Sequence, residues 1–208
     1  VTALLKAGKD PRRIIDALQV AAAELTIQTH DPSNFSMPMH CYEYCNALGW
    51  FYDSFEHPRR LRLLYVAAMF VTMTCHHQAN TGEMVERPVA VPAGAARLSG
   101  REILTRLDAA MLLQQADEAQ GWLRAYLEGQ SDRAGLVRAL ALGASKIGND
   151  PHNQEIPQNM LEDFAKTRSP SRDRLLMACV QHCAGHRKYG DIGEAARRFS
   201  EGVGVPLQ

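Results

Sequence analysis

Apolar residues recur along most of the chain at spacings of three and four positions, the pattern of amphipathic α-helices. The first clear helix starts at Asp10-Pro11, where an N-cap acceptor precedes a proline in the first helical position. One face of this helix is formed by Ile14, Ile15, Leu18, Ala22 and Leu25. No segment shows a convincing period-two alternation, so the pattern predicts an all-α protein.

The same spacing predicts about eight helices in total. The later ones are expected from Met39 to Phe55, Pro58 to about His76, Ser99 to about Gly129, Asp132 to near Gly148, Pro157 to Arg168, and onward from Ser169 and from Asp191. The run from Leu63 to Val71 is apolar nearly all round, which predicts a central, buried helix. Ser99 and Glu102 have the spacing of a capping box, and a bend is expected near Gly121.

The segment from Gln78 to Leu98 loses this periodicity and contains two glycines and two prolines. Long irregular segments in compact domains are often lids or binding loops. A plain linker is the alternative interpretation, and the pattern leaves both open.

Parts of the chain resemble two degenerate copies of one helical unit. Asp31-Pro32, Leu63-Leu64 and Gly82-Glu83 have later counterparts at Asp150-Pro151, Leu175-Leu176 and Gly193-Glu194. This duplication predicts a single helical domain over residues 1–208, built as a pseudo-symmetric bundle. Its expected parts are a first repeat over about residues 3–86, an irregular connector over about 78–98, a linking helix over about 99–123 and a second repeat over about 125–197.

The charge balance and the apolar runs argue against two classes of partner. Lys and Arg total 23 and Asp and Glu total 23, so the net charge is zero and no general basic field attracts nucleic acid. The longest apolar run, from Leu63 to Val71, is too short to span a bilayer. We therefore expect neither a nucleic-acid partner nor a membrane partner.

Two further features concern the compartment and the ends of the chain. The five cysteines are odd in number and lie within apolar helices, which favours reduced thiols in a cytoplasmic protein over a disulfide framework. No secretory signal is visible. Because the first residue is Val1 and Leu4-Leu5 already has a helical pattern, we expect a processed chain or a part of a longer one.

Two His-x-x-Glu pairs are candidate metal ligands. His40 and Glu43 lie three residues apart on an expected helix, and His152 and Glu155 repeat the spacing after Asp150-Pro151. This spacing lets an imidazole and a carboxylate reach one ion, and both donor types suit a transition metal such as iron or zinc. Helical di-iron proteins carry the reverse order, Glu-x-x-His. A histidine that is hydrogen-bonded beside a loop is the alternative for each pair.

His182 and His186 are the third candidate pair, because histidines four residues apart on a helix can chelate a transition metal. The zinc-protease form of this motif has a glutamate directly after the first histidine. Cys183 takes that place here, so the zinc-protease interpretation fails. The alternative is a histidine stabilised by the dipole at the C-terminal end of its helix.

Cysteines and aromatic residues carry two further expectations. Cys41 and Cys45, and Cys179 and Cys183, could together ligate zinc or an iron–sulfur cluster if their helices met, but buried free cysteine commonly behaves as a small hydrophobe. Six aromatic residues are concentrated on one expected helix: Tyr42, Tyr44, Trp50, Phe51, Tyr52 and Phe55. They predict core packing, with the wall of a pocket for a flat apolar ligand as the alternative.

The segment from His40 to Leu48 resembles a group of bacterial all-helical proteins whose chemistry is unsettled. The shared pattern is H-x-x-x-Y-x-N-A, matched by His40, Tyr44, Asn46 and Ala47. Some members carry a C-terminal Rieske-type iron–sulfur domain, which we expect to be absent from this chain. The resemblance implies a redox association that depends on a partner or on an additional domain.

Two functions fit these features. The first is a helical metal- or cofactor-dependent oxidoreductase-associated domain with a site between the repeats, served by a redox partner or by an additional domain of a longer chain. The second is a non-catalytic helical interaction or scaffold module whose histidines are structural. A homodimer is compatible with either, because repeat-built helical domains often leave apolar faces at their ends.

Overall fold

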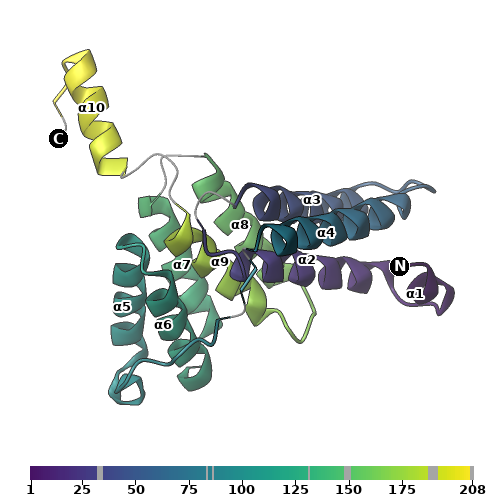
Figure 1. Ribbon diagram of the computed structural model, residues 1–208, viewed down its shortest axis with the longest axis horizontal. Helices are drawn as coiled ribbons and strands as arrows, with labels where there is room; N and C mark the ends of the chain where they lie inside the picture. The colour runs from purple at the N-terminus through teal and green to yellow at the C-terminus, as the bar shows by residue number, and fades with distance from the viewer. Residues whose placement is uncertain are drawn as a thin grey trace. The chain divides into compact units, whose positions relative to one another are not determined.

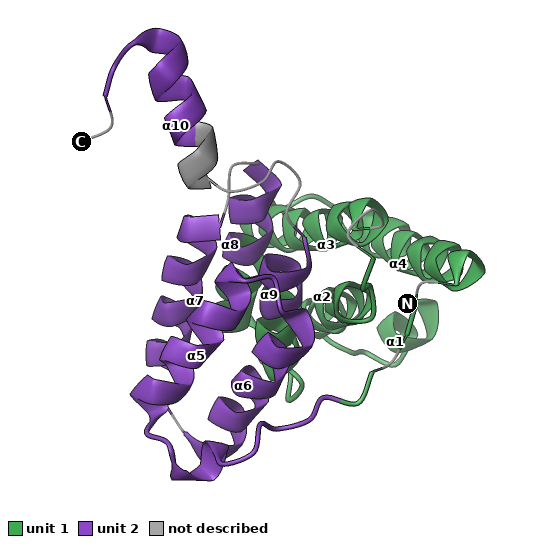
Figure 2. Ribbon diagram, turned by 60° about the vertical axis from the view of Figure 1, so that its left-hand side comes forward, with its two compact units in different colours: residues 1–88, 159–179 green, residues 89–158, 180–208 purple. Residues whose placement is uncertain are grey.

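The computed structural model describes residues 1–31, 35–82, 84–85, 87–130, 132–147, 151–186 and 192–206. Within these ranges the chain forms ten α-helices and one short 3-10 helix, with no strand, so the all-α prediction is confirmed (Figure 1). The chain divides into two compact units (Figure 2). Unit 1 comprises Val1–Pro88 and Asn159–Cys179, and unit 2 comprises Val89–Gln158 and Val180–Gln208.

The number of helices exceeds the expected eight. In chain order they are α1 (Thr2–Lys6), α2 (Pro11–Ile27), α3 (Ser36–Ser54), α4 (Arg62–Thr81), the 3-10 helix η2 (Ala95–Arg97), α5 (Gly100–Leu112), α6 (Ala116–Gly129), α7 (Arg133–Ile147), α8 (Pro151–Lys166), α9 (Asp173–Gly185) and α10 (Ile192–Val203). The helix expected over 99–129 is divided into α5 and α6. The division lies at Gln114, whose φ of 56° is left-handed and ends a right-handed helix, and not near Gly121.

Two helix starts also differ from the expected ones. α8 begins at Pro151, where the missing N–H of a first-turn proline costs nothing, and it continues through Pro157. α9 begins at Asp173 rather than at Ser169. The expected cap at Asp191, the expected helix end near Gly148, and Pro32, Glu83 and Asp150 of the predicted repeats lie outside the described residues.

Unit 1 is a bundle in which α2, α3 and α4 pack against one another, with residues 159–179 completing it. Its fully buried side chains include Ile15, Tyr42 and Leu64. Residues 159–179 fall inside the predicted second repeat, so the units do not follow the predicted repeat boundaries. The duplication itself stays a prediction.

Helix α4 does not have the fully buried position expected from its apolar sequence. Leu64 and Ala67 are buried, but Val66, Met69 and Met73 are 41%, 55% and 55% exposed. The apolar residues are too evenly distributed around α4 for one packing face to cover all of them. The helix therefore presents a methionine-rich face to solvent.

Unit 2 contains α5, α6 and α7, with α5 packing against both of the others. Its buried side chains include Leu107, Leu123 and Leu136. The N-terminus of α5 has the predicted capping box. The Glu102 amide donates to Ser99 Oγ at 3.3 Å, and the Ser99 amide donates to the Glu102 carboxylate at 2.8 Å.

The irregular segment that precedes α5 is shorter than expected, because α4 extends to Thr81. In unit 2 this segment lies against α6. Arg124 Nη1 donates to the Val89 carbonyl at 2.8 Å, and a Cβ added at Gly121 would lie 2.5 Å from the Ala90 carbonyl oxygen. The glycine at 121 thus lets Val89–Pro92 lie directly on the helix.

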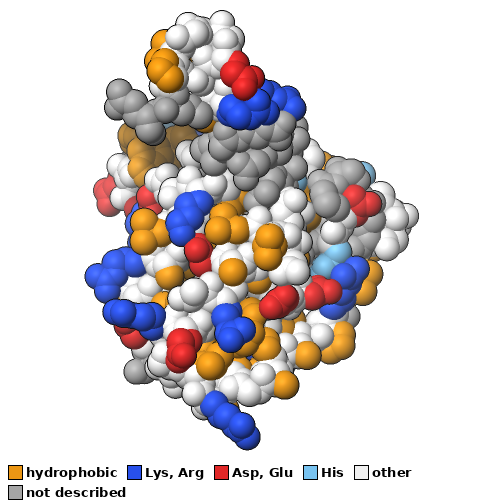
Figure 3. All heavy atoms as spheres, turned by 90° about the vertical axis from the view of Figure 1, so that its left-hand side faces the viewer, with side chains coloured by type: hydrophobic (Ala, Val, Ile, Leu, Met, Phe, Trp, Pro, Cys, Tyr) orange, Lys and Arg blue, Asp and Glu red, His pale blue; other side chains and the backbone are white. Residues whose placement is uncertain are grey.

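No helix in the described part of the chain is both long enough and apolar enough to cross a membrane. On the face drawn in Figure 3, basic and acidic side chains are interspersed rather than gathered into a basic stripe. That distribution agrees with the zero net charge of the sequence.

Candidate functional site

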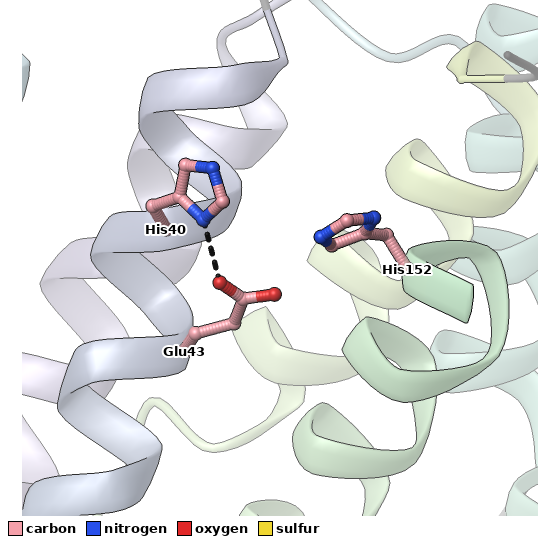
Figure 4. Close-up of side chains that lie close together, drawn as sticks. All are labelled: His40, Glu43 and His152. Carbon is pink, nitrogen blue, oxygen red and sulfur yellow. Dashed lines mark hydrogen bonds and ion pairs between the residues drawn. The ribbon is translucent and has the colours of Figure 1, made fainter. Parts of the chain in front are cut away.

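In unit 1 the structure brings His40 and Glu43 together on one face of α3. Their i, i+3 spacing places His40 Nδ1 2.7 Å from Glu43 Oε2 (Figure 4). The His40 side chain is 51% exposed and that of Glu43 is 22% exposed. The pair therefore offers one imidazole and one carboxylate at a partly solvated position, as the spacing predicts.

In unit 2 the structure brings together three of the other predicted ligands: His152, His182 and His186. The rings of His182, in the last turn of α9, and of His186, which directly follows α9, are 5.3 Å apart between centroids, in keeping with their i, i+4 spacing. His182 Nε2 lies 3.2 Å from the backbone carbonyl oxygen of His152. Both rings are buried, with His182 0% and His186 6% exposed. Glu155 is exposed on α8, one turn after His152.

The contact to the His152 carbonyl fixes the tautomer of His182. A carbonyl oxygen only accepts hydrogen bonds, so Nε2 must carry the proton and donate it. In the neutral ring the lone pair then lies on Nδ1. A histidine that binds a metal is commonly oriented in this way, with its second nitrogen donating to a backbone carbonyl.

The four cysteines that were expected as possible ligands are all free and buried, but they do not all belong to one unit. Cys41, Cys45 and Cys179 belong to unit 1, and Cys183 belongs to unit 2. A hydrogen bond between the Cys41 and Cys45 side chains lowers the pKa of Cys41, whereas the same bond and then burial raise the pKa of Cys45 well above its ordinary value. Cys41 and Cys45 thus form a local thiol pair within α3.

Asp163 is a buried carboxyl group that the sequence interpretation missed. It is 2% exposed and accepts hydrogen bonds from the Tyr42 hydroxyl at 2.9 Å and from Asn46 Nδ2 at 3.2 Å. Burial raises the pKa of Asp163 from 3.8 to about 6, against the opposing effect of these two hydrogen bonds. Burial first, and then the Asp163 charge, raise the pKa of Tyr42, so its hydroxyl stays protonated and donates.

A pocket of about 240 Å³ opens beside Asp163 within unit 1. It is lined by Arg12, Asn46, Ala47, Gly49, Trp50, Asp53, Glu162, Asp163 and Lys166. Arg12 is paired with Asp53 at 3.1 Å and with Asp16 at 3.6 Å, and Lys166 is paired with Glu162 at 3.5 Å. Both cations of the pocket therefore already have an acidic partner.

Gly49 forms part of the pocket wall and lets a buried amide approach it. Gln19 on α2 is 0% exposed, and neither atom of its amide has a hydrogen-bond partner among the described residues. Gln19 Nε2 lies 3.0 Å from the place where a Cβ at Gly49 would stand. A buried amide without partners is costly, which makes this position notable.

Comparison with protein-family models, curated proteins and solved structures finds no match to this chain. No residue role is therefore carried over from another protein. The resemblance to bacterial all-helical proteins stays a prediction.

A signal for the Asp163 position was present in the sequence. Asp163 follows Ile156 and Met160 at i+7 and i+3, so a carboxyl group occupies the buried stripe of α8. Gln19 stands four positions after Ile15 on the buried stripe of α2. A polar residue at a core position of an amphipathic helix is the pattern that could have found both.

The aromatic residues of α3 divide between the two expected roles. Tyr42 is buried in the core, whereas Trp50 is 54% exposed and lines the pocket. Phe51 and Phe55 are exposed and contact Trp50 edge-on. The prediction of core packing therefore holds for Tyr42 and is wrong for these three residues, which lie towards the C-terminal end of the helix.

Proposed function

We propose that the chain binds a transition metal ion, such as iron or zinc, through its histidines and serves as a metal-dependent oxidoreductase-associated domain. The observation that carries the proposal is the arrangement of His182 and His186. Two imidazoles lie one helical turn apart with adjacent rings, and a backbone carbonyl orients the first of them.

The burial of these rings supports a ligand role. Metal-ligating histidines are commonly held in one orientation by the groups around them, and burial restricts both rings in this way. In unit 1 the His40–Glu43 pair is a separate candidate, and its imidazole and carboxylate are donor types that suit iron and zinc. His152 and Glu155 remain proposed ligands on the spacing argument. A bound metal would supply Lewis-acid or redox chemistry at an open coordination position, with electrons from a redox partner or an additional domain.

Metal analysis of the purified full chain tests this proposal. After reconstitution with iron or zinc and removal of excess metal, we expect stoichiometric metal, with the ion of each unit lost at least tenfold when its histidine is replaced, in His182→Ala for unit 2 and in His40→Ala for unit 1. His76→Ala, an exposed histidine at the end of α4, is the matched control and should retain the metal. Only trace metal in the wild-type chain, or full retention in both variants with helical content intact by circular dichroism, would contradict the proposal.

A non-catalytic interaction module is the second candidate, and the exposed methionine-rich face of α4 favours it. Val66, Met69 and Met73 form an apolar face of the kind that partner proteins cover. The metal experiment separates the two candidates, because an interaction module needs no stoichiometric ion.

A further inference from the structure

We infer that the pocket beside Asp163 in unit 1 is a binding site for a small organic ammonium compound. None of the residues that line this pocket is among the proposed metal ligands. The inference rests on the balance of charge, on the partners of each charged group, and on the size and wall of the cavity.

The charged groups of the pocket leave an excess of negative charge. Three carboxyl groups, on Asp53, Glu162 and Asp163, face two cations, on Arg12 and Lys166. Both cations are held by ion pairs with other carboxylates. Asp163 instead takes its two hydrogen bonds from neutral donors. When ionised it is thus a buried anion without a hydrogen-bonded cation, and an ammonium group in the pocket would supply one.

The residues of the pocket wall suit an ammonium group that carries a short alkyl chain. Trp50 and Ala47 line the pocket; Trp50 supplies an aromatic ring, a type of group that attracts cations, and the small side chain of Ala47 leaves room for methylene groups. A volume of about 240 Å³ admits a small amine.

Binding of a cation should release a proton from Asp163. The groups that face it are Tyr42, Asn46 and Cys45 on α3, Arg12 on α2, and Lys166 on α8. With its pKa at about 6, Asp163 is half protonated at pH 6 in the free protein, so binding should expel about half a proton there. Affinity for the ammonium should be about tenfold weaker at pH 5 than at pH 7, because only ionised Asp163 attracts it.

Isothermal titration calorimetry of the full chain with butylamine tests the inference. The matched probes are 1-butanol, which lacks the charge, and butyrate, which reverses it. We expect saturable binding of butylamine alone, with proton release at pH 6 measured from two buffers of different ionisation enthalpy. Equal binding of 1-butanol would show an apolar pocket, and preferential binding of butyrate would show an anion site at Arg12 and Lys166. Either result, or no saturable binding of butylamine, would overturn the inference.

Two variants connect the binding to the pocket. Asp163→Asn should weaken butylamine binding at least tenfold and abolish proton release, whereas Glu56→Gln, an exposed acid of unit 1 outside this pocket, should change neither. If Asp163→Asn does not fold, Trp50→Ala replaces it, with weaker binding expected and wild-type proton release retained. Undiminished butylamine affinity in the folded Asp163→Asn protein would place the amine elsewhere.

Discussion

Replacing Asp163 with asparagine should remove a fall in stability between about pH 4 and pH 7 and make the chain more stable at neutral pH. The unfolded carboxyl loses its proton near pH 3.8, whereas the buried one keeps it until about pH 6. Over that range the folded state binds more protons, so the free energy of unfolding falls as pH rises. The penalty is complete above about pH 7 and amounts to about 3 kcal/mol for this shift.

The replacement amide keeps one of the two hydrogen bonds that hold this position, because its NH2 group faces the donor Asn46 Nδ2, and the Asn46 amide must turn its oxygen towards it to restore the second. The carbonyl oxygen of the replacement amide accepts from the Tyr42 hydroxyl as the carboxylate does, and a neutral amide has no ionisation to desolvate. We therefore expect the variant to fold while its pocket loses the negative charge. A gain in stability that accompanies a loss of binding is typical of a functional group kept at a cost.

Urea unfolding of both proteins at pH 4.5 and pH 7.5 measures this effect. The control is Glu162→Gln, the neighbouring residue on α8, whose carboxylate is 47% exposed and paired with Lys166 at 3.5 Å. That variant should follow the wild type within about 0.5 kcal/mol. If Asp163→Asn has the same pH dependence as the wild type, then Asp163 is ionised at no cost in the folded chain.

Replacing Gly121 with alanine should destabilise the chain by roughly 1–3 kcal/mol, even though alanine is the better helix former. The new Cβ would lie 2.5 Å from the Ala90 carbonyl oxygen and 3.2 Å from Pro92 Cδ. The first of these neighbours is backbone, so Val89–Pro92 would have to move away from α6. The Arg124 bond to the Val89 carbonyl would be strained or lost with it.

Gly129→Ala is the matched control in the same helix. Nothing lies within 4 Å of a Cβ at Gly129, so the substitution should be neutral or stabilise by up to about 1 kcal/mol. Thermal or urea unfolding of the two variants should therefore give shifts of opposite sign. Equal shifts would mean that Val89–Pro92 does not lie against α6 in solution.

Local chemistry made most of the fold predictable. The N-cap at Asp10 and the capping box at Ser99 act within a few residues, and both are present as predicted. The break at Gln114 could not be predicted, because the left-handed conformation is adopted by a residue with no glycine-like signature. The exposed face of α4 could not be predicted, because an apolar sequence does not show how many neighbouring helices are present to cover it.

The candidate sites also divide into contacts within one helix, which the sequence predicted, and contacts between distant segments, which it did not. The spacing of His40 with Glu43, and of His182 with His186, predicted contacts that the structure shows within one helical turn. The hydrogen-bond partners of Asp163 could not be predicted from the sequence. Tyr42 and Asn46 precede it by 121 and 117 residues, and only the packed bundle brings them to its carboxylate.

The discontinuity of unit 1 has a consequence for synthesis on the ribosome. Residues 1–88 emerge well before residues 159–179, which complete the unit. Until then the cavity-facing sides of α2 and α3 lack their partner, and the Tyr42 hydroxyl lacks the carboxylate that accepts its hydrogen bond. The nascent bundle therefore remains incomplete while residues 89–158 of unit 2 are being translated, and its completion is a late, long-range step. An early stop after residue 88 should leave a fragment that chaperones hold rather than a smaller folded protein.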